Sequence, residues 1–416
     1  MTLSGRGVRR REDHPLRGGI VEYLGRLLAP AVSMVVLCTT AACTEPSVDV
    51  PAGSAIRRDS AGIEIVENAP ARHAGIAVSF DSSPAFEIGG ISRDPDTELS
   101  TRASHDIAFL PDGGIVVSNG HQVRLHDADG SLRAMFGRQG EGPGAFTAMI
   151  WSVCVVPPDT ILAVEVPAPR VTALVGDLQF VSTSAFTGRG LPRGCVRDGF
   201  ITSNAPFERI GEEGTTSTYV VRGADGVEKR TIGELPGSNY AGIFAREAGI
   251  AGVPGGFVAA DGRAFEYRRY DDEGVLRAIV RTRDTVAALS DDAVADLVSR
   301  RLGASVPAAQ RRVLVAQAVG QMRDSTVPAF IRLETDNTGR VWLSEPRMGP
   351  GLEAWTVFDA TGQLLGRAEP SALGFPPESR AQVARWSDSL VVIKYLDDDG
   401  AVRLSGFRFR VDPTAP

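Results

Sequence analysis

The chain has 416 residues, of which 43% are hydrophobic and 23% are charged. That apolar fraction is enough for a sizeable core and excludes wholesale disorder. With 44 basic against 51 acidic residues, the formal net charge is −7. This charge argues against a nucleic-acid-binding protein, because such affinity rests on basic surface. Length alone suggests two or three domains, but a repeated all-β fold can use this many residues in one domain.

The N-terminal segment has the layout of an export signal. A start rich in arginine precedes an uncharged stretch over 27–43, whose apolar part, 27–37, is too short to span a bilayer core of about 30 Å as a helix. Small residues at 40–42 then run into Cys43. This ending resembles the lipobox of bacterial lipoproteins, in which the cysteine is diacylated and becomes the mature N-terminus. The alternatives are an ordinary cleaved secretion signal and an uncleaved anchor.

We therefore predict a lipoprotein signal peptide over 1–42, a lipid on Cys43 and a tether over 43–60. Acyl chains contribute about 0.8 kcal/mol per buried CH₂ group, so a lipidated Cys43 would hold the exported protein on a membrane without a transmembrane helix. Thr44 follows the cysteine. Under the enterobacterial sorting rule, in which Asp at this position retains a lipoprotein in the inner membrane, Thr44 predicts the outer membrane.

The rest of the chain repeats two turn patterns. In the first, a polar turn precedes a β-branched run that closes on an acidic or amide residue, with a tyrosine in the last copy. The six copies lie at 111–119, 157–165, 197–204, 254–261, 337–345 and 387–395. Alternation with a period of two, bounded by Gly, Pro, Asn or Asp, predicts a hairpin in each.

The second pattern is a strand that ends in an Asp/Gly turn and is followed by another strand. Its turn glycines are Gly130, Gly176, Gly226, Gly274 and Gly362. The first three gaps between them are 46, 50 and 48 residues, and the fourth is 88, one period plus an insertion of about 40 residues. Glycine suits such turns because it accepts positive φ at little steric cost.

The two patterns interleave to give four short strands per unit, which is the signature of β-propeller blades. The sixth unit has strands near 382–386, 389–396 and 402–409, and then the chain stops. The segment 84–90 ends like other outer strands, so we expect it to complete that unit. The sequence thus predicts an all-β, six-bladed β-propeller over 61–412, closed by strands from both ends of the chain.

The insertion between blades four and five, about 286–325, is predicted to hold two helices. Ser290 is a good N-cap for the first helix, which Gly303 ends, and Pro307 suits the first turn of a second helix that runs to about Met322. This pair of helices either covers apolar propeller surface or acts as a flap that binds a partner.

One segment resembles a known group of proteins. The run FGRQGEGPGAF at 136–146 is similar to the GR-x-G-x-GPGEF segment of bacterial six-bladed β-propeller lipoproteins, relatives of NHL-repeat proteins. Ala145 stands where that group usually has Glu. The resemblance covers roughly 60–410 and implies the architecture more than an activity, because the group is largely without assigned biochemistry.

The glycines of this run do not form a Walker loop, because no Lys-Ser or Lys-Thr follows them. One explanation is that the chain crosses here from blade one to blade two and needs glycines to adopt the required backbone conformation. The alternative is a ligand contact made by Arg138 and Glu141.

A set of oxygen-bearing residues closes the second strand of five units: Asn119, Glu165, Asn204, Asp261 and Glu345. Metal-dependent six-bladed lactonases gather such residues near the propeller axis to hold Ca²⁺, a cation that prefers oxygen ligands. The other interpretation is that these side chains cap backbone groups of the following turn, as in NHL repeats.

The remaining candidates for chemistry are one histidine and two cysteines. His105 and Asp106 open the predicted inner strand of blade one, where a general base facing the axial channel is conceivable. The sequence contains neither an HExxH nor a GxSxG motif. Cys154 and Cys195 lie in inner strands of neighbouring blades and form either a disulfide, which persists in exported proteins, or two buried free thiols.

The function predicted from the sequence is a non-catalytic binding or scaffold module in the cell envelope. Its partners would be the membrane, through the lipid, and an envelope protein or small ligand that the sequence does not identify. The alternative is a Ca²⁺-dependent hydrolase or lactonase, and a third possibility is an adhesion or assembly module. No other cofactor is expected.

Overall fold

The computed structural model describes residues 54–92, 94–103, 105–187, 190–204, 216–236, 249–286, 288, 290–302, 306–322, 327–347 and 351–412. The predicted signal peptide, Cys43 and most of the predicted tether lie outside the described residues, as does the side chain of Asn204.

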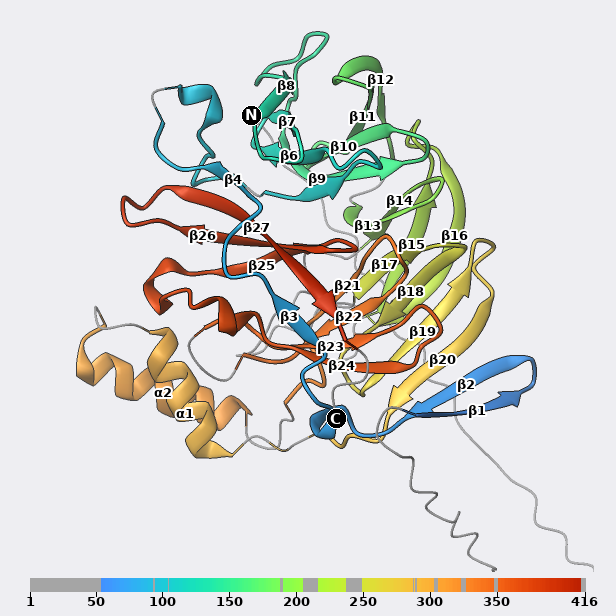
Figure 1. Ribbon diagram of the computed structural model, residues 1–416, viewed down its shortest axis with the longest axis vertical. Coiled ribbons are helices and arrows are strands. Elements are labelled where there is room, and N and C mark those ends of the chain that lie inside the picture. Colours follow the sequence, from blue (N-terminus) through green and yellow to red (C-terminus); the bar gives the residue numbers. More distant parts are fainter. Residues whose placement is uncertain are drawn as a thin grey trace, which may run out of the picture. The chain divides into compact units, whose positions relative to one another are not determined.

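The described strands form six blades around a ring, as the repeat predicts, and within 107–411 the strands of each blade follow one another in chain order from the inside outward (Figure 1). Blades one to three consist of β5 (Ile107–Phe109), β6 (Ile115–Asn119), β7 (Gln122–His126) and β8 (Leu132–Phe136); β9 (Met149–Val156), β10 (Thr160–Val166), β11 (Arg170–Val175) and β12 (Gln179–Ala185); and β13 (Leu191–Val196), β14 (Gly199–Asn204), β15 (Thr216–Arg222) and β16 (Glu228–Pro236).

Blades four to six continue the ring. They consist of β17 (Gly249–Val253), β18 (Gly256–Ala260), β19 (Glu266–Asp271) and β20 (Leu276–Thr282); β21 (Arg332–Thr335), β22 (Val341–Ser344), β23 (Trp355–Phe358) and β24 (Leu364–Ala368); and β25 (Gln382–Trp386), β26 (Leu390–Leu396) and β27 (Val402–Val411). Short 3₁₀ helices lie at η1 (Ala71–His73), η2 (Pro95–Thr97), η4 (Pro370–Leu373) and η5 (Pro377–Ser379).

The sixth blade is composite, and this confirms the predicted closure by both ends of the chain. β4 (Phe86–Gly89) pairs antiparallel with the first half of β27, and β3 (Val78–Phe80) pairs with its last residues. Figure 1 shows these two blue segments beside the red C-terminal strand. The ring therefore leaves little open sheet edge at the point where the chain begins and ends.

A hairpin upstream of β3 extends blade four. β1 (Ala55–Ser60) and β2 (Ile63–Asn68) pair antiparallel, and β2 adds parallel to β20, so that blade four becomes a six-stranded sheet. Residues 43–60 were predicted to form a tether, but β1 occupies the last six of them. Four of its six residues are exposed, so the alternation of buried and exposed side chains that marks a strand is missing.

The insertion holds the two expected helices, α1 (Asp291–Arg301) and α2 (Ala308–Met322), between β20 and β21. Ser290 caps α1, since its Oγ accepts a hydrogen bond from the backbone N–H of Ala293 at 3.1 Å. The apolar face of α1 packs within the insertion; the residues of this cluster are Val294, Leu297, Val298, Leu302, Val315, Ala318, Val319 and Val327. The helices are thus held by each other more than by the blades.

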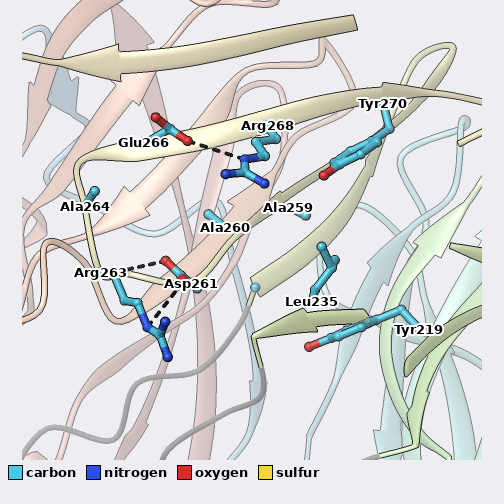
Figure 2. A pocket seen from close by; sticks show the side chains of 11 residues that line it. Tyr219, Leu235, Ala259, Ala260, Asp261, Arg263, Ala264, Glu266, Arg268 and Tyr270 are labelled. Atoms are coloured by element: carbon cyan, nitrogen blue, oxygen red, sulfur yellow. Dashed lines mark hydrogen bonds and ion pairs between the residues drawn. The ribbon is translucent and has the colours of Figure 1, made fainter. Parts of the chain in front are cut away.

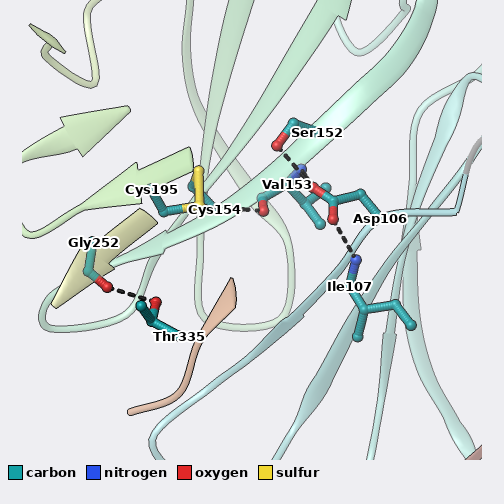
Figure 3. Close-up of a disulfide and its surroundings, with 8 residues drawn as sticks. All are labelled: Asp106, Ile107, Ser152, Val153, Cys154, Cys195, Gly252 and Thr335. Carbon is teal, nitrogen blue, oxygen red and sulfur yellow. Dashed lines mark hydrogen bonds between the residues drawn. A yellow bond between two sulfur atoms is a disulfide. The ribbon is translucent and has the colours of Figure 1, made fainter. Parts of the chain in front are cut away.

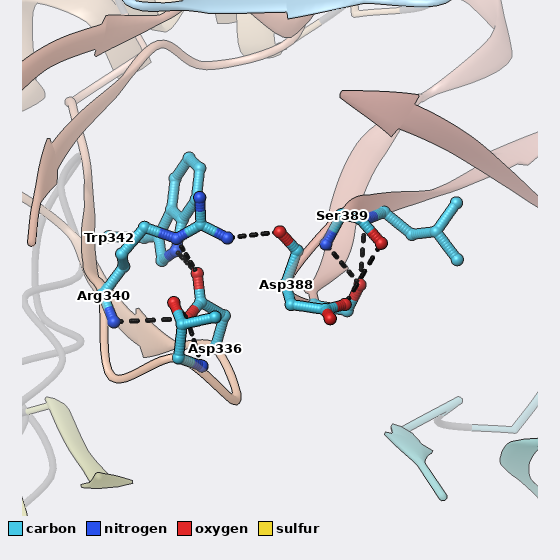
Figure 4. A network of polar contacts seen from close by, with 8 residues as sticks. Asp336, Arg340, Trp342, Asp388 and Ser389 are labelled. Carbon is cyan, nitrogen blue, oxygen red and sulfur yellow. Dashed lines mark hydrogen bonds and ion pairs between the residues drawn. The ribbon is translucent and has the colours of Figure 1, made fainter. Parts of the chain in front are cut away.

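In the described part of the chain, the core of the propeller consists of six clusters, one between each pair of neighbouring blades. Between blades five and six, the rings of Trp342 and Trp386 stack with centroids 3.9 Å apart. Asp336 accepts hydrogen bonds there from Trp342 Nε1 at 2.9 Å and Arg340 Nε at 2.6 Å, and Arg340 donates onward to the backbone oxygen of Asp388 (Figure 4). This network ties the first turn of blade five to that of blade six.

Polar contacts and one covalent bond connect inner strands of adjacent blades (Figure 3). Cys154 on β9 and Cys195 on β13 form a disulfide, which is one of the two states that the sequence left open. Asp106 Oδ2, ahead of β5, accepts hydrogen bonds from Ser152 Oγ at 2.7 Å and from the N–H of Val153 at 2.9 Å. These contacts link blades one, two and three near the axis.

Candidate functional site

The residues that close the second strands lie at the same end of their blades. Asn119 ends β6, Glu165 is the penultimate residue of β10, Asp261 follows β18 and Glu345 follows β22. Because these strands run in equivalent directions, their ends share one face of the ring, which we call the strand-end face.

Asn119 and Glu165 hold backbone groups of nearby loops. Asn119 Oδ1 accepts a hydrogen bond from the N–H of Ser100 at 2.9 Å. Glu165 is fully buried, and its Oε1 accepts from the N–H of Ala148 at 3.0 Å, while Arg170 lies 3.6 Å from its Oε2.

Asp261 and Glu345 also have partners close by. Asp261 Oδ1 accepts from the N–H of Arg263 at 3.0 Å, which closes a local turn. Glu345 forms a two-pronged ion pair with Arg367, at 2.8 and 2.9 Å.

The four described oxygen-bearing side chains are therefore all engaged by hydrogen bonds or ion pairs of their own, and only Asp261 caps the turn that follows it. Among the described residues, no three His, Cys, Asp or Glu side chains gather closely enough to hold a metal ion. The side chain of Asn204 lies outside the described residues.

His105 is only 8% exposed, and neither of its ring nitrogens has a hydrogen-bond partner among the residues that the structure describes. Burial, followed by the nearby charge of Lys394, lowers its pKa to about 4. The imidazole is thus neutral at pH 7, but both nitrogens are shielded from solvent. This geometry does not present His105 to a substrate as a general base.

Arg138 and Glu141 are exposed, and the segment around them has a structural role. The backbone oxygen of Arg138 accepts a hydrogen bond from the N–H of Phe146 at 2.8 Å, and the Phe146 ring is fully buried in the cluster between blades one and two. A Cβ on Gly137 would lie 2.3 Å from that ring. The glycine is therefore needed for the crossover to pack.

Sequence reasoning missed two cavities at the strand-end face. They lie on either side of the loop of blade four that joins β18 to β19. We call the larger one the insertion cavity, because it reaches the base of α1, and the smaller one the tyrosine cavity.

The insertion cavity has a volume of about 580 Å³ and lies between blades four and five. Its apolar lining residues include Ala71, Phe265, Val286, Val327, Pro328 and Ala329. They come from η1, the loop of blade four and both ends of the insertion. A narrow extension of only about 10 Å³ continues toward Phe330 and Phe358, so closely packed core forms the floor.

Charged groups at the rim of the insertion cavity are already paired. Asp284 Oδ2 accepts from the N–H of Ala71 at 2.5 Å and from Thr282 Oγ1 at 2.7 Å. Glu345 forms its ion pair with Arg367, and the hydrogen bonds of this pair raise the pKa of the Arg367 guanidinium. An apolar ligand can therefore enter without leaving a new unpaired charge.

The tyrosine cavity, of about 250 Å³, lies between blades three and four (Figure 2). The polar and aromatic side chains that line it are Tyr219, Tyr270, Asp261, Arg263, Glu266 and Arg268. The signal for it in the sequence is weak: Glu266, Arg268 and Tyr270 alternate along β19 and so share one face of the strand.

No family model and no curated protein matches the chain. Among solved structures, a "Putative exported protein" from Bacteroides fragilis NCTC 9343 is 11% identical, with a TM-score of 0.49, and covers 83% of this chain and 99% of its own. A DUF4221 family member from Bacteroides vulgatus is 10% identical, with a TM-score of 0.45, and covers 80% and 99%.

A streptogramin B lyase is 12% identical, with a TM-score of 0.39, over 82% of this chain and 90% of its own. Within the described part of the chain, neither helix has the length and apolar character needed to cross a membrane.

Proposed function

We propose that the protein is an exported binding module of the bacterial cell envelope, held on a membrane through a lipid on Cys43, with the insertion cavity as its ligand site. The cavity itself carries the proposal. Its volume of about 580 Å³ lies within the range of roughly 300–1,000 Å³ that is usual for small-molecule sites. Like most such sites, it is apolar inside and has a few placed polar groups.

The lining favours an uncharged, largely apolar ligand. Phe265, from the loop of blade four, and Val327, from the C-terminal end of the insertion, form apolar parts of the cavity wall. Thr356 contributes a hydroxyl group. The carboxylate and guanidinium of Glu345 and Arg367 neutralise each other. A charged ligand would have to compete with that ion pair, whereas an apolar body would only displace water.

The test is a fluorescence titration with N-phenyl-1-naphthylamine, a neutral apolar probe. Ala293 lines the cavity from the first turn of α1, so Ala293→Phe should fill part of it. Ala316→Phe, on the exposed side of α2, is the matched control. We expect the first variant to weaken probe binding at least about tenfold, which corresponds to about 1.4 kcal/mol, and the control to bind normally. Equal binding by the two variants would refute the proposed site.

Membrane attachment is tested separately from ligand binding. Cys43→Ser should move the protein from the membrane fraction to the soluble fraction, while Cys38→Ser, inside the predicted signal, should not. Thr44→Asp should redirect the protein to the inner membrane where the enterobacterial sorting rule applies. Attachment that survives Cys43→Ser would contradict the lipid anchor.

A further inference from the structure

We propose that the tyrosine cavity is a second site, which binds one neutral pyranose unit, either as a free monosaccharide or within a glycan. This site is separate from the insertion cavity and shares none of its lining residues. The argument rests on the balance of its charges, the position of its aromatic rings and its size.

The charges of the cavity are balanced in two local ion pairs. Arg263 Nε lies 3.6 Å from Asp261 Oδ2, and Arg268 Nε lies 3.4 Å from Glu266 Oε1. The two arginine side chains are about half exposed, at 48% and 51%, so their remaining N–H groups can reach a ligand. Each pair therefore offers donors and acceptors side by side.

This arrangement suits hydroxyl groups better than ions. A hydroxyl group can accept a hydrogen bond from a guanidinium and donate one to the neighbouring carboxylate at the same time. An anion or a cation would gain from one half of each pair and be repelled by the other half.

The tyrosines supply a rigid aromatic wall. The ring of Tyr270 stacks on Phe257 with centroids 4.9 Å apart and an interplanar angle of 10°, and Tyr219 is only 1% exposed. Figure 2 shows both hydroxyl groups directed toward the side of the cavity where the arginines lie. Such rings present an apolar body with a polar tip. The C–H face of a pyranose can pack against the ring of Tyr270, which is partly exposed, whereas Tyr219 lines the cavity with almost no exposed surface.

The volume selects a single ring. At about 250 Å³ the cavity is below the range of roughly 300–1,000 Å³ for drug-sized ligands. Small side chains, Ala259, Ala260 and Ala264, keep this space open. A longer glycan could occupy it with one residue and leave the others in solvent.

Saturation-transfer NMR tests the proposal with neutral methyl glycosides of glucose, galactose and mannose, and with N-acetylglucosamine. Glucuronate and glucosamine serve as charged comparisons. We expect at least one neutral sugar to bind more tightly than both charged ones. A tetrasaccharide of the preferred sugar that binds more tightly than the monosaccharide would indicate a glycan as the source, and equal or weaker binding would indicate a free sugar.

Two variants connect the signal to the cavity. Arg268→Ala should weaken sugar binding about tenfold or more, because hydrogen bonds to a charged group are lost. Arg269→Ala is the control, since it lies on the opposite face of the same strand. Ala293→Phe, which fills the insertion cavity, should leave sugar binding unchanged. The proposal would be overturned if no neutral sugar gave a saturation-transfer signal at millimolar concentration, or if a charged sugar bound more tightly than the neutral ones. It would also be overturned if Arg268→Ala and Arg269→Ala weakened sugar binding equally.

Discussion

Asn68, the last residue of β2, donates a hydrogen bond from its side-chain amide to the backbone oxygen of Gly362, which lies 3.0 Å away and 294 residues later in the chain. Its amide oxygen accepts from the N–H of Leu364 at 2.8 Å, and the residue is fully buried. The N-terminal hairpin, which pairs with blade four, is thus also bonded to the turn between β23 and β24 of blade five.

Loss of this contact should destabilise the propeller. Asn68→Ala leaves two buried backbone groups without partners, and each such group costs about 1–3 kcal/mol. We expect the free energy of unfolding in urea to fall by at least about 1 kcal/mol. Asn337→Ala, at an exposed turn position, should change it by less than about 0.5 kcal/mol. Similar values for the two variants would show that the hairpin adds nothing to the ring.

The turn of the same hairpin carries local strain that a substitution can relieve. Ala61 has φ +56° and Gly62 has φ +83°, as a two-residue turn with positive φ at both positions requires. Asparagine tolerates this conformation better than alanine does. Ala61→Asn should therefore raise the free energy of unfolding by about 0.5–1 kcal/mol, and Ala61→Val should lower it. The reverse order of the two variants would argue against this turn geometry.

The disulfide should stabilise the protein by constraining the unfolded chain. It joins Cys154 to Cys195 across a sequence separation of 41 residues. In the chain-entropy model such a loop corresponds to about 3–4 kcal/mol. The double variant Cys154→Ala and Cys195→Ala should unfold at a correspondingly lower urea concentration. Thiol labelling of the denatured mature protein without reductant should leave both cysteines unmodified, and labelling of the pair would contradict the bond.

Protonation of His105 should couple folding to pH. Burial lowers its pKa to about 4 in the folded protein, against about 6.5 when unfolded. The unfolded chain therefore binds more protons between these values, and stability falls as pH decreases from about 6.5 to 4, by up to about 3 kcal/mol. Urea unfolding of wild type and His105→Leu across this range measures the difference.

The variant should lose less stability than the wild type between pH 6.5 and 4. Burial lowers the pKa of His126 as well, so part of the acid sensitivity should remain in the variant. Parallel pH profiles for the two proteins would show that His105 titrates normally.

The sequence predicted the propeller well because its signals are local. The glycines of the blade turns, such as Gly130 and Gly362, have positive φ as the turns require. The segment 84–90 could be placed in blade six because its ending repeats that of other outer strands. β1 was missed because its turn uses Ala61 where asparagine or aspartate is the recognisable residue, and because its side chains are mostly exposed.

The cavities could not be predicted from local pattern. The insertion cavity brings together Ala71, Phe265 and Val327, which lie far apart in the chain and belong to no shared motif. The ring of oxygen ligands, one of the two interpretations of the sequence, rested on a real repeat of position, but each described side chain is bound to a neighbour of its own. A repeated position in a propeller therefore reflects the structure of the blade, whereas the two cavities arise where the blades and the insertion differ.

The most direct test of the proposed ligand site is a crystal structure of the mature protein soaked with N-phenyl-1-naphthylamine. We predict density for the probe between Phe265 and Val327, beside the first turn of α1, and none at that place in Ala293→Phe. Probe density only elsewhere on the molecule, or a cavity that stays filled by its own side chains, would contradict the assignment.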